Sequence, residues 1–244
     1  MIRRIIFSFL LVCINIFVWG QLDAEFSSNL TSGCSPLVVV FSDQTTGGAP
    51  TNWDWSFGNG NSSVGSDPSV NKNPSAIYNT PGTYTVTLTV SDGVGSDTET
   101  KTAYITVFED PIADFIASSV LGCAPFEVDF TDLSTSNTGT INQWFWDFGD
   151  GNISNQKNPT NIFMTAAMRT VSLVVTDDNG CNNTLQIPNM IEVVDPPTAA
   201  FSGMPLLACA PPLNVSFTDA STSTSALTYI WDFGDGNSSN SSNP

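Results

Sequence analysis

Apolar and polar residues alternate along several stretches of the chain, most strictly in two of them. Residues 83–93 read TYTVTLTVSDG and residues 168–178 read MRTVSLVVTDD. Residues two apart in an extended strand point to the same face of a sheet, so this alternation predicts strands with one buried face. The aliphatic residues expected to share that face are Val86, Leu88 and Val90 in the first stretch and Val171, Leu173 and Val175 in the second.

Further strands are expected at residues 103–108 and 190–194, where apolar and polar residues alternate again. Outside residues 1–20 no stretch has a helical period, because proline or turn residues interrupt every candidate. The chain is therefore predicted to be all-β.

A seven-residue phrase occurs three times. It reads WSFGNGN at 55–61 and WDFGDGN at 146–152 and 231–237. Each copy follows a Cys, a Pro and an alternating stretch that ends in Asp (CSPLVVVFSD, CAPFEVDFTD and CAPPLNVSFTD), and each precedes an Asn-Pro pair. The proline lies 13 residues after the tryptophan in the second and third copies and 19 residues after it in the first. The first copy therefore carries an insertion of six residues.

The repeats divide the chain into a leader, residues 1–20, and three units that we call module 1 (21–108), module 2 (109–194) and module 3 (195–244). Modules 1 and 2 each hold short strands with a turn about every ten residues, which is typical of a two-sheet immunoglobulin-like β-sandwich. Module 3 stops at its Asn-Pro pair, whereas module 2 continues for 35 residues after its own pair, from Pro159 to Val194. We expect module 3 to be a truncated sandwich.

The leader has the pattern of a signal peptide. Arg3 and Arg4 precede an almost wholly apolar run, residues 5–19, that is shorter than the roughly 20 residues needed to cross a bilayer. We expect cleavage after Gly20 and a secreted or cell-surface mature chain with no membrane span. The alternatives are an uncleaved membrane anchor and a lipid anchor at Cys13, although bulky residues before Cys13 disfavour the second.

Three interpretations of the repeated phrase compete: a metal-binding Asp of the kinase type, a calcium loop and a structural turn. The kinase type requires an HRD loop, and the sequence has no histidine. An EF-hand loop needs oxygen ligands at positions 1, 3 and 5, but counting from Asp147 positions 3 and 5 are glycines. The first copy also has Ser56 and Asn59 where module 2 has Asp147 and Asp150. We expect a structural turn and no cofactor, with calcium at other loop carboxylates as the alternative.

The turn is expected to follow a strand with one aromatic face. Trp144, Trp146 and Phe148 are two apart and so share a face, which predicts a wall of the core; an exposed sugar-stacking surface is the alternative. The glycines of the turn are expected to adopt positive φ. The residues assigned to this motif are Trp55, Phe57, Gly58 and Gly60 in module 1, Trp146, Asp147, Phe148, Gly149, Asp150 and Gly151 in module 2, and Trp231, Asp232, Phe233, Gly234, Asp235 and Gly236 in module 3.

Composition excludes several classes of function. The formal net charge is −17, and without the two arginines of the leader it is −19. Such an acidic chain repels phosphate backbones and anionic lipids, so neither nucleic acid nor a membrane surface is an expected partner. The absence of histidine excludes Ser-His-Asp and Cys-His nucleophiles and histidine-bound zinc. No enzymatic activity is expected.

The cysteines predict one disulfide. Cys123 opens module 2 and Cys181 follows its penultimate strand, and exported domains commonly contain disulfides, so we expect these two to pair. In a gapless alignment Ser96 takes the place of Cys181 in module 1. Cys34 and Cys209 then have no expected partner in their own modules.

The motif W-D-F-G-D-G, preceded by C-x-P and V-x-F and followed by NP and PGTYTVTLTV, resembles the polycystic kidney disease (PKD) domain. The resemblance covers residues 22–108, 111–194 and half of a further domain from Pro196. Module 2 departs from it at Arg169, where module 1 has Tyr84, which puts a tyrosine corner in doubt there. The resemblance implies an extracellular, non-catalytic β-sandwich that spaces or presents other domains and makes protein or carbohydrate contacts.

Two functions follow as hypotheses. In the first, the chain is a non-enzymatic array of an adhesin-like surface or secreted protein, and its partners are extracellular proteins or polysaccharides. In the second, it is an accessory array of a secreted protease or glycoside hydrolase whose catalytic domain lies beyond Pro244.

Overall fold

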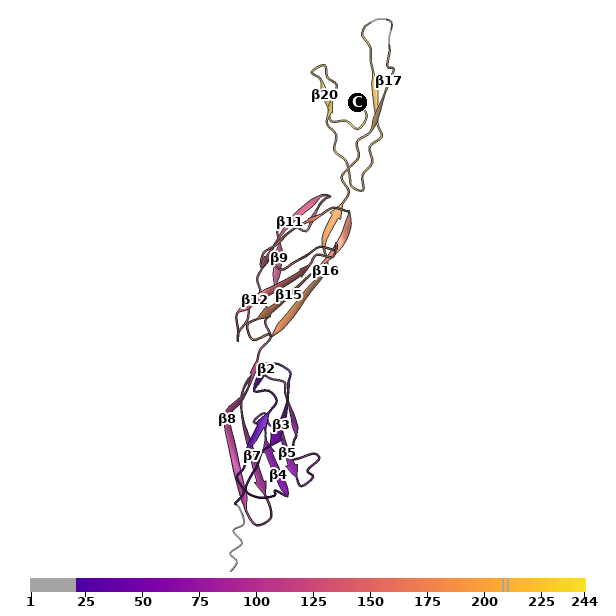
Figure 1. Ribbon diagram of the computed structural model, residues 1–244. Coiled ribbons are helices and arrows are strands. Elements are labelled where there is room, and N and C mark those ends of the chain that lie inside the picture. The colour runs from indigo at the N-terminus through magenta and orange to yellow at the C-terminus, as the bar shows by residue number, and fades with distance from the viewer. Residues whose placement is uncertain (1–20, 208, 210) are drawn as a thin grey trace, which may run out of the picture. The chain divides into compact units, whose positions relative to one another are not determined.

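The computed structural model describes residues 21–207, 209 and 211–244, so the expected signal peptide lies outside the described residues. The described chain is built from strands and turns and contains no α-helix, which confirms the all-β prediction (Figure 1). Accordingly, none of the described residues forms a helix that could cross a membrane. The chain divides into two compact units, with the boundary between Glu109 and Asp110.

Module 1 has two sheets. The larger sheet has five strands in the order β2–β8–β7–β4–β5, and the smaller has three in the order β1–β3–β6. All neighbours are antiparallel except β2 and β8, which run parallel. The strands of the larger sheet are β2 (Ser32–Cys34), β8 (Ser96–Phe108), β7 (Gly82–Ser91), β4 (Asn52–Ser56) and β5 (Ser62–Gly65). Those of the smaller sheet are β1 (Phe26–Ser28), β3 (Leu37–Asp43) and β6 (Ser75–Tyr78).

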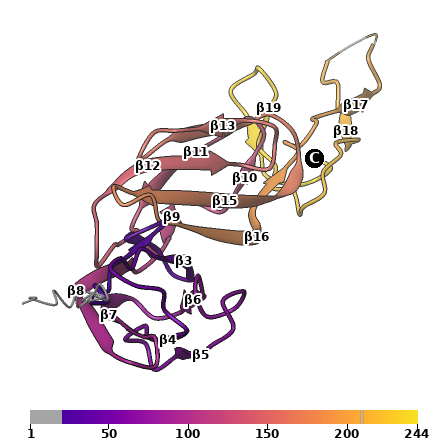
Figure 2. The same cartoon turned by 60° about the horizontal axis from the view of Figure 1, so that its bottom comes forward.

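Module 2 repeats this topology strand for strand. Its larger sheet has the order β10–β16–β15–β12–β13, whose strands are labelled in Figure 2, and its smaller sheet has the order β14–β11–β9. The strands of the larger sheet are β10 (Leu121–Cys123), β16 (Asn182–Val194), β15 (Ala167–Asp177), β12 (Ile141–Asp147) and β13 (Ile153–Ser154). Those of the smaller sheet are β14 (Thr160–Phe163), β11 (Phe126–Asp132) and β9 (Phe115–Ala117). Both modules are therefore immunoglobulin-like sandwiches, as the repeat predicts.

The core of each module lies between its two sheets, and alternation along the strands selects its members. Val86, Leu88 and Val90 on β7 are all 0% exposed, and so are their counterparts on β15. Fully burying such an aliphatic side chain contributes about 1.5–3 kcal/mol. The predicted inner faces are therefore confirmed. Other fully buried residues are Val39, Phe41 and Trp55 in module 1 and Val128, Trp146 and Ile191 in module 2.

The gapless alignment of modules 1 and 2, which pairs Ser96 with Cys181, is wrong at the turn between β7 and β8. In module 1 the hairpin closes with Ser91 opposite Ser96, whereas in module 2 Thr176 lies opposite Asn182. The turn of module 2 is thus one residue longer. Ser96 corresponds to Asn182, and Cys181 belongs to the longer turn.

Module 3 has only short strands: β17 (Phe201–Met204), β18 (Ser216–Asp219), β19 (Trp231–Asp232) and β20 (Ser238–Ser239). β17 pairs with β18 and β19 with β20, and the described residues supply no further strand to either pair. Phe201, the counterpart of the buried Phe26, is 65% exposed. With so little apolar surface removed from water, this segment has little to offset the entropy of ordering its chain.

We therefore expect module 3 to be unfolded or aggregation-prone when nothing else covers it. In a polypeptide of residues 21–244, backbone hydrogen exchange is predicted to be fast after Pro196 and slow in the long strands of modules 1 and 2, because exchange reports local opening. Strong protection across residues 227–233 in the monomeric chain would contradict this expectation.

Candidate functional site

The tryptophan of the repeated phrase lies at the centre of each core. Trp146 on β12 is 0% exposed, and its ring contacts Phe115 edge-on at 5.1 Å and Phe130 at 5.6 Å between centroids. In module 1 the corresponding distances from Trp55 are 5.2 and 5.6 Å. The wall is not complete in module 2, where Trp144 is only partly buried. The aromatic face of this strand is therefore core surface in both modules and not a sugar-stacking platform.

The indole N–H of this tryptophan makes the same hydrogen bond in every module. Trp146 Nε1 donates to the main-chain oxygen of Gln156, at 2.9 Å. The acceptor lies two residues before the Asn-Pro pair, in the segment that crosses from the larger sheet to the smaller one. The equivalent bonds are Trp55 Nε1 to Asn71 O, 2.8 Å, and Trp231 Nε1 to Ser241 O, 2.8 Å. This bond ties the larger sheet to the crossing segment.

A second set of bonds holds the Asn-Pro pair itself, and the alternation along the strands does not predict it. In module 2 the Asn158 side chain accepts the main-chain N–H of Asp132 at 2.9 Å, and Pro159 O accepts the N–H of Phe130 at 2.9 Å. The Asp132 carboxylate in turn accepts the indole N–H of Trp144 at 2.9 Å. Asp43 and Asn73 repeat the pattern in module 1, and Asp219 and Asn243 repeat its main-chain bond in module 3. We call this set the Asp–Asn clasp.

The residues of the clasp recur in the sequence. The strand-ending Asp and the Asn-Pro pair recur in all three copies, as Asp43, Asp132 and Asp219 and as Asn73, Asn158 and Asn243. Each pair is separated by 24 to 30 residues, so only the folded structure shows that the two recurrences bond to one another.

The glycines of the turn have the positive φ that was predicted. Gly149 has φ of 72°, and a Cβ built on it would lie 2.5 Å from the main-chain oxygen of Thr170 on β15. Gly151 has φ of 94° with open space around it. Gly58, Gly60, Gly234 and Gly236 have φ between 76° and 92°. Gly149 is thus required both by its backbone conformation and by the approach of the neighbouring strand.

The Asp and Asn side chains of the turn accept main-chain N–H groups. Asp147 accepts the N–H of Gly149 at 2.9 Å, and Asp150 accepts that of Asn152 at 3.0 Å. The other oxygen of Asp150 accepts the side-chain amides of Asn152 and of Asn161 on β14, at 3.1 and 2.9 Å. The turn at the end of the larger sheet is therefore bonded to the smaller sheet.

Module 1 makes the same link with different atoms. Asn59 stands at the position of Asp150, and its side-chain amide donates to Ile77 O on β6 at 3.0 Å. An amide donor does here what a carboxylate acceptor does in module 2. The shared property of this position is a bond between the sheets, which favours the structural interpretation of the phrase over a metal-binding one.

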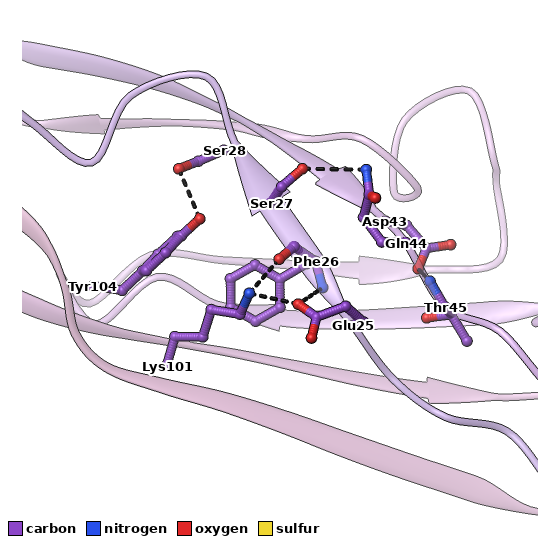
Figure 3. A network of polar contacts seen from close by, with 9 residues as sticks. All are labelled: Glu25, Phe26, Ser27, Ser28, Asp43, Gln44, Thr45, Lys101 and Tyr104. Atoms are coloured by element: carbon purple, nitrogen blue, oxygen red, sulfur yellow. Dashed lines mark hydrogen bonds and ion pairs between the residues drawn. The ribbon is translucent and has the colours of Figure 1, made fainter.

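Module 1 has a further link between its sheets, shown in Figure 3. Lys101 Nζ on β8 donates to the carboxylate of Glu25 and to the main-chain oxygen of Phe26, and it lies 4.7 Å from the centre of the Phe26 ring. The hydrogen bond from Lys101 lowers the pKa of the Glu25 carboxyl group. In module 2, Ile187 occupies the strand position of Lys101, opposite Val171. The ion pair is specific to module 1.

The predicted Cys123–Cys181 disulfide is wrong. Cys123 is free and exposed, whereas Cys181 is buried and disulfide-bonded. Cys123 lies opposite Val194 at one end of β16, and Cys181 directly precedes Asn182 at the other end of this 13-residue strand. At about 3.3 Å per residue the two lie roughly 40 Å apart, while a disulfide joins Cα atoms about 5.5–6 Å apart. Cys34 is also disulfide-bonded, and Cys209 is free.

Comparison with known proteins identifies the repeated module. Residues 21–107 and 109–193 each match the family model of the PKD domain. The chain is 33% identical over 134 residues to the pre-pro-metalloprotease PrtV of Vibrio cholerae, which is 54% of this chain and 14% of PrtV. It is 29% identical over 92 residues to collagenase ColA of Bacillus cereus, which is 37% of this chain and 9% of ColA. The chain thus matches only a small part of these relatives.

Two solved structures are similar to single modules. The PKD1 domain of Vibrio anguillarum Epp is 32% identical, and the match covers 34% of this chain and 95% of that domain with a TM-score of 0.31. The PKD1 domain of Vibrio cholerae PrtV is 30% identical, with coverage of 34% and 98% and a TM-score of 0.31.

The structural role of Trp146 leads to a prediction with two substitutions. Trp146→Ala is expected to destabilise module 2 by about 3–5 kcal/mol, because it removes a fully buried aromatic side chain. Trp146→Phe keeps most of the packing but leaves Gln156 O without its donor, so we expect a loss of about 1–3 kcal/mol. Urea denaturation with hydrogen exchange measured separately for each module provides the test. Module 1 serves as the internal control, and an unchanged module 2 in Trp146→Ala would contradict the core role.

The Glu25–Lys101 pair predicts a pH dependence confined to module 1. The folded-state pKa of Glu25 is lowered, so its stabilisation is complete above its unfolded pKa of about 4.3 and is lost as the pH falls toward the folded value. Glu25→Gln is expected to lower the melting temperature of module 1 at pH 7 and to reduce its loss on acidification. Asp54→Asn, at an exposed position of β4, is the matched control. A Glu25→Gln variant as acid-sensitive as the parent would contradict the assignment.

Proposed function

The chain belongs to the PKD domain family, and on that premise we propose that it is a non-catalytic extracellular array that spaces or presents other domains and contacts proteins or polysaccharides. The proposal rests on where the residues of the repeated phrase lie and what they bond to. Its tryptophans fill the cores of modules 1 and 2, and its Asp and Asn side chains bond to main-chain and side-chain groups of their own module. The residues that recur therefore build the fold, and contacts with partners are left to residues that do not recur.

One surface of module 2 supports the interaction part of the proposal. Phe145, on the outer face of β12, is 44% exposed, whereas Phe148, the other phenylalanine of the module's large sheet and turn, lies in the core. It lines an open groove together with Gln143, Asn155 and Thr176. An aromatic ring surrounded by amide and hydroxyl groups suits a sugar ring, because one side offers apolar contact and the rim offers hydrogen bonds.

Module 1 lacks this feature. Asp54 stands at the position of Phe145, since Asp54 lies opposite Thr89 on β7 as Phe145 lies opposite Val174 on β15. Any contact made by Phe145 is therefore specific to module 2.

An adhesin-like protein is the first context that we propose for these modules. The second is a secreted protease, in which they would be accessory modules. Support for the second comes from PrtV and ColA, which by their names are a metalloprotease and a collagenase and which match this chain over a small part of their length. In both contexts the modules themselves carry no catalysis.

The test is co-sedimentation of the exported chain with insoluble cellulose, chitin and collagen fibrils. We expect the folded chain to bind at least one polysaccharide and Phe145→Ala to weaken that binding at least several-fold, while Asp54→Ala has no effect. Loss of binding without loss of stability identifies a surface role, because Phe145 is outside the core. Binding to none of the three matrices would contradict the interaction part of the proposal. Hydrolytic activity toward casein or gelatin that co-purifies with the chain would contradict the proposal that the array is non-catalytic.

A further inference from the structure

Asn59 is followed by Gly60, and the side chain and main chain of such a pair can react with each other. The peptide nitrogen of the residue after an asparagine can attack the side-chain carbonyl carbon, and glycine leaves this approach open because it has no Cβ. One further Asn-Gly pair lies among the described residues, Asn179 and Gly180 in module 2. The two pairs lie in different surroundings, and this difference predicts which of them reacts.

Asn59 is placed for this reaction. Its Nδ2 donates to Ile77 O on β6 at 3.0 Å, and its Oδ1 accepts the main-chain N–H of Asn61 at 3.0 Å. The second bond draws electron density from the side-chain carbonyl, so its carbon becomes a better electrophile. Gly60 is exposed and has open space around the position of a Cβ, and no acceptor among the described residues takes its N–H. The attacking nitrogen is therefore unencumbered.

The nitrogen of the second pair is already bonded. Gly180 N donates to Asp177 O at 3.0 Å, and Asn179 Nδ2 donates to Thr138 O at 2.9 Å. The N–H of Gly180 has to leave its bond before the nitrogen can react, and this local opening costs free energy. The surroundings of Asn59 thus favour the reaction, and those of Asn179 oppose it.

We propose that Asn59 is a site of spontaneous deamidation, which removes a bond between the two sheets of module 1. Gly60 N attacks Cγ of Asn59, a C–N bond forms, the Cγ–Nδ2 bond breaks, and ammonia leaves with the proton of Gly60 N. Water then opens the succinimide ring. Opening at one carbonyl leaves aspartate at this position, and opening at the other leaves isoaspartate, whose main chain has one extra carbon. Water is the only co-reactant.

Neither product can make the bond that the amide makes. An ionised carboxylate has no hydrogen to donate, so Ile77 O loses its donor and faces a second acceptor instead. Isoaspartate also lengthens the main chain of the turn, whose ends are joined by the bond from Phe57 N to Asn61 O at 3.2 Å. Deamidation is therefore expected to weaken module 1.

Module 2 shows what a carboxylate at this position requires. Asp150 accepts the side-chain amide of Asn161 at 2.9 Å, and Asn161 lies opposite Val128 in the smaller sheet. The corresponding residue of module 1 is Ala76, which lies opposite Val39. Alanine has no amide, so a carboxylate formed in module 1 lacks the donor that Asp150 has. Module 1 is thus matched to an amide at this position and module 2 to a carboxylate.

The first experiment follows the conversion by peptide mapping. A polypeptide of residues 21–244 is incubated at mildly alkaline pH, which favours the deprotonated peptide nitrogen, and the peptides that contain Asn59 and Asn179 are separated and weighed by mass spectrometry. We expect Asn59 to convert roughly tenfold faster than Asn179, because only the second nitrogen has to break a hydrogen bond first. The same incubation in urea is expected to remove most of this difference. Equal rates in the folded chain, or an Asn59 that stays intact while Asn179 converts, would overturn the proposal.

The second experiment measures the effect of the conversion on module 1, with module 2 as the internal control. The melting temperature of module 1 is expected to fall as Asn59 converts. Asn59→Asp is expected to lower it without any incubation. Asn59→Gln closes the ring far more slowly, because its side chain is one carbon longer, so its melting temperature is expected to stay constant over the same period. An Asn59→Asp chain that melts with the parent would overturn the proposal.

A double-mutant cycle tests the missing donor at position 76. Ala76→Asn supplies the amide that module 2 has at this place, so we expect it to be less costly in the Asn59→Asp background than in the parent. Thermal unfolding of the four chains gives the coupling between the two positions. Strictly additive changes in stability would contradict the account of why the carboxylate weakens module 1.

Discussion

The hydrogen bond from the buried tryptophan to the crossing segment is the constraint on which each module depends. An indole N–H inside a core must have an acceptor, because an unpaired buried donor is costly. The acceptor is a main-chain oxygen two residues before the Asn-Pro pair in all three copies. This requirement fixes where the chain leaves the larger sheet, and the Asp–Asn clasp then fixes where it enters the smaller one.

The same constraint explains where the chain tolerates insertion. Module 1 has six extra residues between its tryptophan and its proline, yet Trp55 still donates to the residue two before Asn73. The extra residues form a longer edge strand, β5, and a loop in which Asp67 accepts the N–H of Ser69. What is held constant is the position of the acceptor and not the length of the chain before it. Positions that take no part in the indole bond or the Asp–Asn clasp are free to differ, as Asp54 on β4 and Phe145 on β12 do.

Alternation and repetition predicted most of the fold. The inner faces of β7 and β15, the aromatic strand and the positive φ of the turn glycines all follow from side-chain size and strand geometry, which are local properties. The disulfide was predicted wrongly because the alignment places Cys123 and Cys181 in one module but does not show that a 13-residue strand separates them. The Asp–Asn clasp was missed for a related reason, since its partners come from separate segments and meet only when the two sheets pack.

The indole hydrogen bond closes modules 1 and 2, and the exchange of the indole protons themselves is the most direct measurement of its role. We predict that the Nε1–H protons of Trp55 and Trp146, followed by NMR, exchange with solvent only through unfolding of their modules. In a polypeptide of residues 21–244, the Nε1–H of Trp231, which donates to the equivalent acceptor beside the exposed Phe201, is predicted to exchange orders of magnitude faster. Exchange of the Trp146 proton at the rate of an unfolded chain, under conditions where the strands of module 2 stay protected, would contradict the account.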